Sequence, residues 1–367
     1  MVEWKKLGDI CQIGTGSNNR EDACDNGIYP FFVRSQDVLK INTYLFDEEA
    51  ILIPGEGGIG DIFHYINGKY GLHQRTYRVH PISDLIIGKY IYYYLFANFK
   101  NYINQKSYKS TAASIRKPML TDFPISILSL SEQNRIVDIL DTFTASIENL
   151  KEQITQRRKQ FEHYRDQLLS GFTEIKKIGE LTKVFSCPRV FRDQWKDSGV
   201  PFWRSSDIMS YHNRVKNPRG EAFISQSLYE ELSKKSEKID EGDILVTGGG
   251  SIGIPYLKRD NSPLFVKDAD LLCIKKCKTI IPSYLYHYFF STEFKLYLKK
   301  ITHDATIAHY TIGQIIDTPI PVPSIEEQSR IVSFLDTFEA SIANLEAQLS
   351  QREKQYEYYR NKLLTFE

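Results

Sequence analysis

Two glycine-rich segments have the residue types and spacing of a nucleotide-phosphate loop. The pattern G-x-G-x-x-G occurs at Gly55–Gly60 and again at Gly248–Gly253. In dinucleotide-binding proteins this loop opens a helix whose N-terminus binds the pyrophosphate. Here Gly60 is followed by Asp-Ile-Phe-His-Tyr-Ile and Gly253 by Ile-Pro-Tyr, which do not begin a helix. We therefore interpret both segments as tight turns between strands, where glycine is needed for positive φ.

Other residue types that carry catalysis or bind metals are sparse. The five cysteines are scattered, and the one close pair, Cys273 and Cys277, lacks a second Cys or His pair that would complete a zinc site. The sequence contains no Walker A motif and no Asn/Asp-Pro-Pro-aromatic tetrapeptide of the kind that aminomethyltransferases use. It therefore predicts reduced, mostly structural thiols, no metal site and no catalytic residues.

Basic residues form two clusters whose chemistry suits DNA. Residues 100–121 carry five Lys and Arg, two interleaved tyrosines and no acid, and residues 183–219 carry eight basic residues against three aspartates. Lys and Arg contact phosphates, Arg is the best reader of guanine edges, and Gln or Asn of adenine edges. The candidate DNA contacts are Arg20, Arg34, Gln36, Lys106, Tyr108, Lys109, Arg116, Arg189, Arg192, Arg204, Arg214 and Lys216. Since a solvated surface charge is the simpler interpretation of most single positions, the prediction rests on the clusters.

Length and composition exclude several classes of protein. The chain has 367 residues, which predicts two or three domains, and 41% hydrophobic and 25% charged residues are typical of a globular protein. Because the net charge is +1, attraction to nucleic acid must come from local clusters. The longest nearly apolar run, residues 90–99, is about half the length of a membrane span. The N-terminus lacks a secretory apolar segment, so we expect a cytoplasmic protein.

The segments that carry and position the candidate residues form an internal repeat. Residues 124–169 and 319–364 align at a constant offset of 195 with 27 identities in 46 positions. The upstream parts repeat more weakly in the same order: KKLGDI matches KKIGEL, and GIYPFFVRSQD matches GVPFWRSSD. The two copies kept their last segments alike while the upstream parts diverged. We therefore expect the upstream parts to have different targets.

Each near-constant segment predicts a long helix. Both begin with a capping box, Ser129-x-x-Glu132 and Ser324-x-x-Glu327, and core-type residues then recur at alternating spacings of four and three. The first seam is Ile136, Leu140, Phe143, Ile147, Leu150, Ile154, Arg157, Phe161, Tyr164 and Leu168, and the second is Ile331, Leu335, Phe338, Ile342, Leu345, Leu349, Arg352, Tyr356, Tyr359 and Leu363. This spacing is typical of a coiled coil.

The helix length sets a distance. Glu132 to Leu169 is a rod of about 57 Å at ~1.5 Å per residue, and Gly171 is a natural stop signal. If the two helices pair antiparallel, the globular parts lie at opposite ends about a pseudo-two-fold axis. Arg157 and Arg352 interrupt the seams, either as snorkelling side chains, which is the simpler interpretation, or as polar residues that fix the register.

The fold class that follows is α+β, with two mixed α/β domains separated by two long antiparallel coiled-coil helices in an internal pseudo-two-fold repeat. The expected boundaries are 1–125 for the first domain, 126–171 for its helix, 172–320 for the second domain and 321–367 for the second helix. Within the domains we expect a hairpin at Asn67-Gly68 and short helices at 90–99 and 284–294.

The duplicated order of variable domain and capped helix resembles the specificity subunit of type I restriction-modification systems. The helix blocks SEQNRIVDILD and EEQSRIVSFLD carry the resemblance, together with GIYPFFVRSQD and GVPFWRSSD near the start of each domain. The exits TAASIRKPMLTDFPI and DATIAHYTIGQIIDTPIPVP into the helices fit as well. The resemblance covers essentially the whole chain.

The resemblance implies a non-catalytic subunit whose two target-recognition domains each read one half of a bipartite, asymmetric DNA site through the major groove. It implies that the helices set the spacing and recruit two methyltransferase subunits, which restriction subunits then join. This chain would bind no cofactor, while S-adenosylmethionine, ATP and Mg²⁺ would serve its partners. The exposed side of the helices is the candidate docking surface, with Gln133, Arg135, Gln153 and Lys159 repeated as Gln328, Arg330, Gln348 and Lys354.

Other functions stay open at this point. Common ancestry with little drift also explains the repeated helix surface. The chain fits a scaffold that carries two non-nucleic-acid binding domains on a coiled coil, in keeping with its net charge of +1. It also fits an enzyme that uses a nucleotide at the twin glycine loops. Within the resemblance, an orphan or phase-variable subunit has the same sequence features as an ordinary member.

Overall fold

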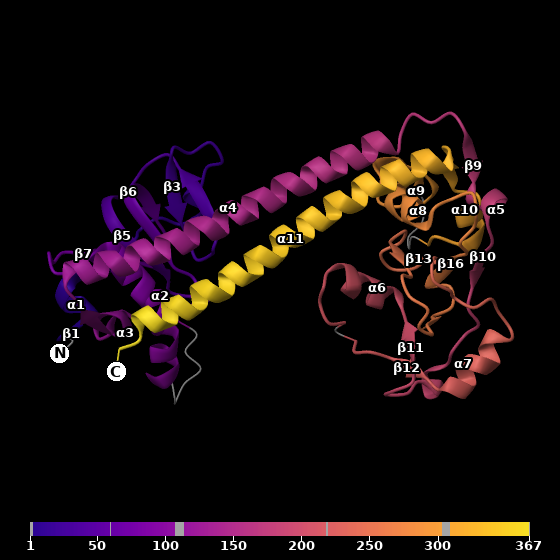
Figure 1. Ribbon diagram of the computed structural model, residues 1–367. Coiled ribbons are helices and arrows are strands. Elements are labelled where there is room, and N and C mark those ends of the chain that lie inside the picture. The colour runs from indigo at the N-terminus through magenta and orange to yellow at the C-terminus, as the bar shows by residue number, and fades with distance from the viewer. Residues whose placement is uncertain (1–2, 59, 107–113, 218, 303–308, 367) are drawn as a thin grey trace. The chain divides into compact units, whose positions relative to one another are not determined.

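The computed structural model describes residues 3–58, 60–106, 114–217, 219–302 and 309–366. The chain forms two compact units, one of residues 1–152 and 346–367 and the other of residues 153–345. Each unit contains a globular part and one end of each of the long helices α4 (Leu130–Leu168) and α11 (Ile325–Leu364). The predicted α+β class is confirmed (Figure 1).

The first unit is built on a six-stranded sheet in the order β2-β7-β5-β6-β3-β4, antiparallel except for β3 with β6. Its strands are β2 (Cys11–Thr15), β3 (Tyr29–Phe32), β4 (Val38–Ile41), β5 (Phe46–Pro54), β6 (His64–Leu72) and β7 (Thr76–Pro81), with β1 (Glu3–Lys6) and β8 (Pro124–Ile127) paired separately. Its helices are α1 (Leu7–Ile10), η1 (Arg20–Asp22), α2 (Gly88–Lys106) and α3 (Lys117–Thr121). One apolar cluster joins β5, β7 and α2 to the start of α4 and to Leu364 of α11.

Two expectations for the first unit differ from the structure. The Asn67-Gly68 hairpin is wrong, because β6 runs straight through this dipeptide and pairs with Glu49 and Glu48 of β5. Gly68 takes a φ of +132° inside the strand, so the glycine serves the strand's local conformation and not a chain reversal. The helix expected at 90–99 exists but is longer, from Gly88 to Lys106.

The second unit divides its strands among three small sheets, β10-β16-β13-β14, β12-β11-β15 and β17-β9. The strands are β9 (Ile175–Lys177), β10 (Val184–Ser186), β11 (Val200–Trp203), β12 (Phe223–Ile224), β13 (Ile244–Thr247), β14 (Pro255–Leu257), β15 (Phe265–Val266), β16 (Leu271–Ile274) and β17 (Pro319–Pro321). The helices are α5 (Ile178–Leu181), η2 (Arg192–Gln194), α6 (Ser205–His212), α7 (Gln226–Ser233), α8 (Pro282–Tyr288), α9 (Thr292–Ile301) and α10 (Ile312–Ile316). The single helix expected at 284–294 is therefore two, α8 and α9.

The central strand β13 of the second unit is buried on both faces. Ile244 and Val246 belong to the apolar cluster that includes α8 and the start of α11, while Leu245 belongs to a second cluster with β11 and β15. Successive side chains of a strand point to opposite faces, which explains the alternation. The second unit thus has two cores that share one sheet.

Within each unit the long helices run antiparallel. In the first unit the Phe143 ring stacks on Tyr359 with centroids 5.3 Å apart, and Lys151, two turns later in α4, pairs with the earlier residue Glu353 of α11. In the second unit Phe161 packs on Phe338 at 5.8 Å. Tyr164 then meets the earlier residue Phe334. The predicted antiparallel coiled-coil pairing is confirmed.

The seam arginines lie over aromatic rings of the opposite helix. The guanidinium of Arg157 sits 5.2 Å from the Phe338 centroid, and that of Arg352 sits 5.6 Å from the Phe143 centroid. The two contacts are related by the repeat, since each residue of one is 195 positions from its counterpart in the other. Arg157 is exposed and Arg352 half-buried, which fits a charge kept near water above an apolar ring.

One buried amide in each unit ties the globular part to its helix. Gln133 is fully buried; its Nε2 donates to the carbonyls of Leu85 and Leu128 at 2.8 and 2.9 Å, and its Oε1 accepts from the backbone N–H of Ile87 at 2.9 Å. Gln328 is equally buried, and its Nε2 bonds the carbonyls of Thr279 and Pro323. We call these two residues the glutamine clamps.

The second clamp repeats the first bond for bond. The Oε1 of Gln328 accepts from Ile281 N at 2.8 Å, as that of Gln133 does from Ile87 N. The expectation that Gln133 and Gln328 lie on an exposed docking surface is therefore wrong: a polar side chain with three bonds to backbone groups is held inside the fold.

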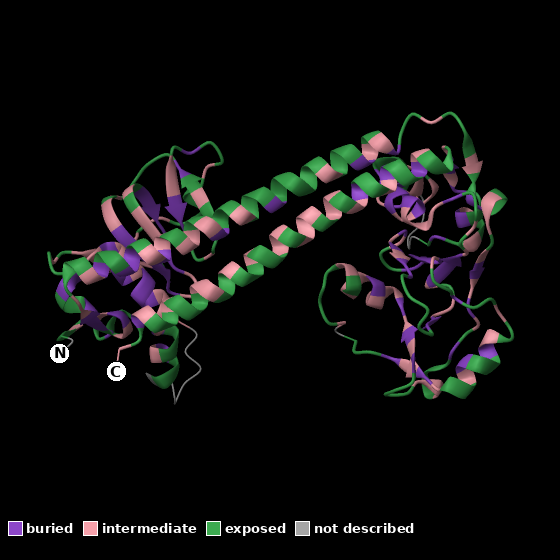
Figure 2. Cartoon of the chain, viewed as in Figure 1, coloured by how far each residue is buried: buried purple, intermediate pink, exposed green. Residues whose placement is uncertain are grey.

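Burial differs along the helices. Between Glu148 and Gln160 only Ile154 of α4 is buried, whereas the part of the helix before Glu148 carries several buried residues and the part after Gln160 carries Arg165 (Figure 2). Among the described residues no helix is long and apolar enough to span a membrane.

The five cysteines are free thiols, as predicted, and burial raises the pKa of Cys11 and Cys187 to about 12.

Replacing Gln133 with alanine should lower the free energy of unfolding by about 2 to 4 kcal/mol, because two carbonyls and one N–H lose their buried partner. Chemical denaturation of the wild type and variant measures the difference. The matched control is Gln160→Ala in the same helix, an exposed position where the change should stay within about 0.5 kcal/mol. Equal losses from the two substitutions would contradict the clamp.

Candidate nucleic-acid interface

The first glycine motif is a turn between β5 and β6, as the sequence predicted. Gly57, Gly58 and Gly60 have φ of +72°, +86° and +73°, and the chain continues into β6. Two backbone bonds hold the start of the turn: Gly55 N donates to the Arg75 carbonyl at 2.9 Å, and the Gly55 carbonyl accepts from Ile115 N at 2.7 Å. The turn is thus fixed on both sides at Gly55.

A three-membered ion network crosses this turn. The carboxylate of Glu56 accepts from Arg34 Nη1 at 2.8 Å and from Arg75 Nη1 at 2.9 and 3.1 Å. These bonds, that of Arg75 first, hold the pKa of Glu56 below its ordinary value. Exposed fractions of 42% for Arg34, 57% for Arg75 and 35% for Glu56 leave all three side chains accessible from solvent.

A hollow of about 220 Å³ opens beside the network. Arg20, Arg34, Glu56 and His73 line it, with Val33, Ser35 and Gly57 completing the wall. His73 is buried, and burial together with Arg34 and Arg75 lowers its pKa. The hollow therefore offers two cationic donors and one anionic acceptor around a concave surface.

The structure brings together two of the DNA contacts predicted for the first unit, Arg20 and Arg34. Gln36 and Arg116 are exposed. The side chain of Lys106, and Tyr108 and Lys109 as a whole, lie outside the described residues.

Sequence reasoning missed three residues of this site, Glu56, Arg75 and His73. The one signal for Glu56 was its place inside the glycine motif. Nothing in the sequence indicated that Arg75, 19 positions later, would reach its carboxylate.

The second glycine motif has the same backbone arrangement with other side chains. Gly248 N donates to the Asp270 carbonyl at 2.8 Å and the Gly248 carbonyl accepts from Tyr310 N at 2.9 Å. Gly249 takes the place of Glu56, and Asp270, which bonds Lys267 Nζ at 2.6 Å, takes the place of Arg75. The turn is common to both units, while the charges beside it are not.

The expectation that Arg204 contacts DNA is contradicted by its burial. Its side chain is 7% exposed, pairs with Asp207 at 2.8 Å and donates to the Gly220 carbonyl. The guanidinium thus closes the start of α6 and a nearby loop. The four other candidates of this unit, Arg189, Arg192, Arg214 and Lys216, are exposed.

The remaining docking candidates are exposed. Arg135 pairs with Glu132 and Arg330 with Glu327, both at 2.6 Å, so the helix starts are alike in both units. Gln153, Lys159, Gln348 and Lys354 are exposed on the helices.

One group of metal-ligand types occurs among the described residues, His287 with Asp336 and Glu339. His287 Nε2 lies 2.9 Å from Asp336 Oδ1, and this bond lowers the pKa of Asp336, while burial raises that of Glu339. In the first unit the repeat places Tyr93 and Asp141 at the positions of His287 and Asp336, and the Tyr93 hydroxyl donates to Asp141 at 2.7 Å. We therefore interpret the group as a tie between α8 and α11.

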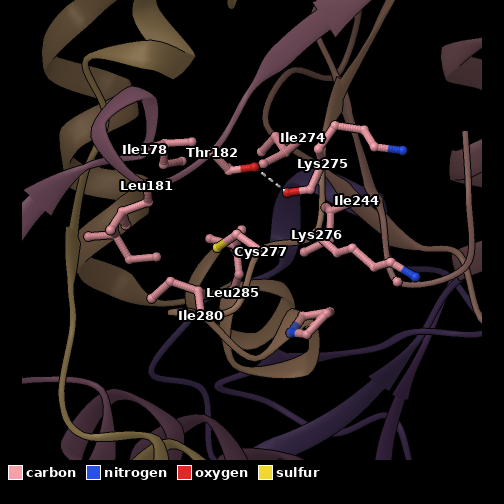
Figure 3. A pocket seen from close by; sticks show the side chains of 13 residues that line it. Ile178, Leu181, Thr182, Ile244, Ile274, Lys275, Lys276, Cys277, Ile280 and Leu285 are labelled. Atoms are coloured by element: carbon pink, nitrogen blue, oxygen red, sulfur yellow. Dashed lines mark hydrogen bonds between the residues drawn. The ribbon is translucent and has the colours of Figure 1, made fainter. Parts of the chain in front are cut away.

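One pocket of the second unit is apolar. It lies in the second unit between α5, β16 and α8, where Ile178, Leu181, Ile280 and Leu285 surround about 10 Å³ (Figure 3). The Thr182 hydroxyl satisfies the Lys275 carbonyl at its edge. A space for about one water, lined by aliphatic groups, has no catalytic chemistry.

Comparison with known proteins identifies the family of this chain. Residues 1–157 and 172–353 match the family model described as the type I restriction modification DNA specificity domain. The chain belongs to this family. The resemblance found in the sequence is thereby confirmed, and two copies of the specificity domain account for the internal repeat.

Relatives of this specificity subunit cover its whole length. It is 28% identical over 386 aligned residues to a Haemophilus influenzae protein named as a type I restriction enzyme specificity subunit, with 100% of this chain and 96% of that protein covered. It is 25% identical to the EcoDI specificity subunit of Escherichia coli, over 95% of this chain and 86% of the relative. The type I S subunit from M. genitalium has the same fold, with a TM-score of 0.64 at 15% identity over 100% of this chain and 97% of that one.

Replacing Arg204 with alanine should destabilise the subunit by about 3 kcal/mol, because the carboxylate of Asp207, which is 11% exposed, loses its cationic partner. Arg192→Ala removes the same charge from an exposed position and should change stability by no more than about 0.5 kcal/mol. Denaturant unfolding of both variants tests this. If Arg204→Ala unfolded like the wild type, Arg204 would again be a candidate DNA contact.

Proposed function

We propose that this specificity subunit reads a bipartite, asymmetric DNA site, with one globular part on each half and contacts made in the major groove. The observation that carries the proposal is the repeat itself. Both units present the same glycine turn, held by equivalent backbone bonds, but different charged side chains beside it. Two readers of common architecture and unlike chemistry are suited to two unlike half-sites.

Exposed basic side chains in both units support DNA as the ligand. Arg20 and Arg34 line the hollow of the first unit, and Arg189, Arg192, Arg214 and Lys216 are exposed in the second. The net charge of +1 gives no general attraction to DNA, so binding must come from these local groups.

The paired helices would set the spacing of the half-sites and dock two methyltransferase subunits. Their pairing repeats across the chain, with Arg157 over Phe338 answered by Arg352 over Phe143. The exposed residues Arg135, Lys159, Arg330 and Lys354 would contact the methyltransferases, since equal surfaces in both halves suit two copies of one partner. A solved structure similar in fold concerns complex assembly of the type I restriction-modification system.

Catalysis would belong to the partners. S-adenosylmethionine would be bound by the methyltransferase subunits, and ATP and Mg²⁺ by restriction subunits that join them in the cytoplasm. For this chain we propose recognition alone, without a cofactor of its own, which fits relatives named as specificity subunits.

The proposal is tested by selecting bound duplexes from a random DNA library with the subunit co-purified with its methyltransferase, and sequencing them. We expect a gapped motif with two different halves, and an affinity that falls steeply as salt rises, because phosphate contacts release counterions. Binding insensitive to salt with no enriched motif would contradict DNA recognition and favour the scaffold with two other binding domains.

A further inference from the structure

The residue after the fixed glycine differs between the two units at one structurally equivalent point. In the first unit that residue is Glu56, and in the second it is Gly249. The backbone on either side is held alike. Gly55 and Gly248 each donate to the residue just before a strand, Arg75 before β7 and Asp270 before β16. Each also accepts from the residue two positions before a short helix, Ile115 before α3 and Tyr310 before α10, with all four bonds at 2.7 to 2.9 Å. The difference is therefore one of side chains on a shared support.

The arginines that match in sequence have opposite roles in the two units. Arg34 and Arg204 occupy the same place in the repeated blocks FFVRSQD and PFWRSSD. Arg204 is buried against Asp207 and the Gly220 carbonyl. Arg34 is 42% exposed, lines the hollow and bonds Glu56. The arginine is therefore buried in the second unit, whereas in the first unit it lies at the surface beside the Glu56 carboxylate.

The Arg34, Glu56 and Arg75 network is expected to add little to the free energy of unfolding. Exposed ion pairs contribute little to folding, because solvent screens them and ordering long side chains costs entropy. The buried glutamine clamps were retained in both repeats, but this network was not. A surface network present in one repeat only is suited to a task that differs between the repeats.

We propose that the Arg34 and Glu56 side chains read one G·C base pair of the first half-site from the major groove. In that groove guanine presents the acceptors O6 and N7, and cytosine presents the N4 amino donor. Arg34 would donate to the guanine and Glu56 would accept from the cytosine. The inference deepens the proposed function and rests on it.

The geometry favours this base pair because the donor and the acceptor are already ordered side by side. Arg75 Nη1 bonds both carboxylate oxygens of Glu56, at 2.9 and 3.1 Å, and so acts as a positioning residue for the carboxylate. The bond from Arg34 Nη1 to Glu56 engages one of the five N–H donors of Arg34. An A·T pair would place the adenine N6 donor against the Arg34 donors, which is unfavourable.

Arg20 also lines the hollow. It is exposed in the short helix η1, and a guanidinium there suits a phosphate of the backbone next to the base pair read by Arg34. In the hollow, Arg20 would thus contact the DNA backbone and Arg34 would contact the base pair.

The experiment is the same random-duplex selection, with Arg34→Ala and Glu56→Gln, each in the full subunit co-purified with its methyltransferase. We expect each variant to lose preference for G·C at one position of one half-site by roughly 5- to 150-fold, with the other half-site unchanged. The control is Lys6→Ala, which removes the same charge from an exposed ion pair with Asp122 elsewhere in the same unit and should leave the motif unaltered.

The outcomes are distinct. Unchanged melting temperatures for Arg34→Ala and Glu56→Gln show that the variants fold, as expected for exposed residues. A wild-type motif that neither variant alters, or that both alter in both halves, would overturn this inference and leave the proposed function standing. Failure of the wild type to select any two-part motif would overturn the proposed function and the inference with it.

Discussion

In each unit one fully buried amide bonds the backbone of the globular part to the start of a long helix. Gln133 and Gln328 each offer two donors and one acceptor to backbone groups of segments that precede the helix in the chain. An aliphatic side chain could not bond these two carbonyls and one N–H, so the position requires a side chain that has both donors and an acceptor. Because the glutamine clamps fix the orientation of each globular part on its helix, the side chains beside the glycine turn can differ between the two units.

The pairing of α4 with α11 also uses one contact twice. The seam carries arginines at Arg157 and Arg352, where an aliphatic residue would be expected, and each guanidinium lies over the phenyl ring of the other helix. The contact keeps the charge hydrated on one side and the ring covered on the other. Two equal contacts also make the pairing of α4 with α11 the same from either end, as a pseudo-two-fold repeat requires.

The sequence was sufficient for features that follow from local rules. The capping serines accept as predicted, Ser129 from Glu132 N and Ser324 from Glu327 N, and the glycine motifs form turns with positive φ. Periodicity could not reveal the burial of Gln133, because polarity normally marks an exposed position and two of its three partners lie 46 and 48 residues away.

The readers depend on partners brought together by the tertiary fold. Arg204 and Arg34 match in sequence, as do Asp207 and Asp37 three residues later, so local sequence does not show which arginine is buried. The contacts that differ are made by the tertiary fold, with the Gly220 carbonyl for Arg204 and with Glu56 for Arg34. The Asn67-Gly68 dipeptide shows the same limit, since pairing with β5 over its full length overrides the local turn preference.

The central claim is that the two globular parts are independent readers on equivalent supports. It is tested most directly by a chimaera in which residues 5–123 replace residues 176–318, so that both positions carry the first reader. The account predicts that this chain, with its methyltransferase, selects a palindromic motif made of two inverted copies of the first half-site. Retention of the asymmetric wild-type motif, or loss of both halves by a folded chimaera, would contradict it.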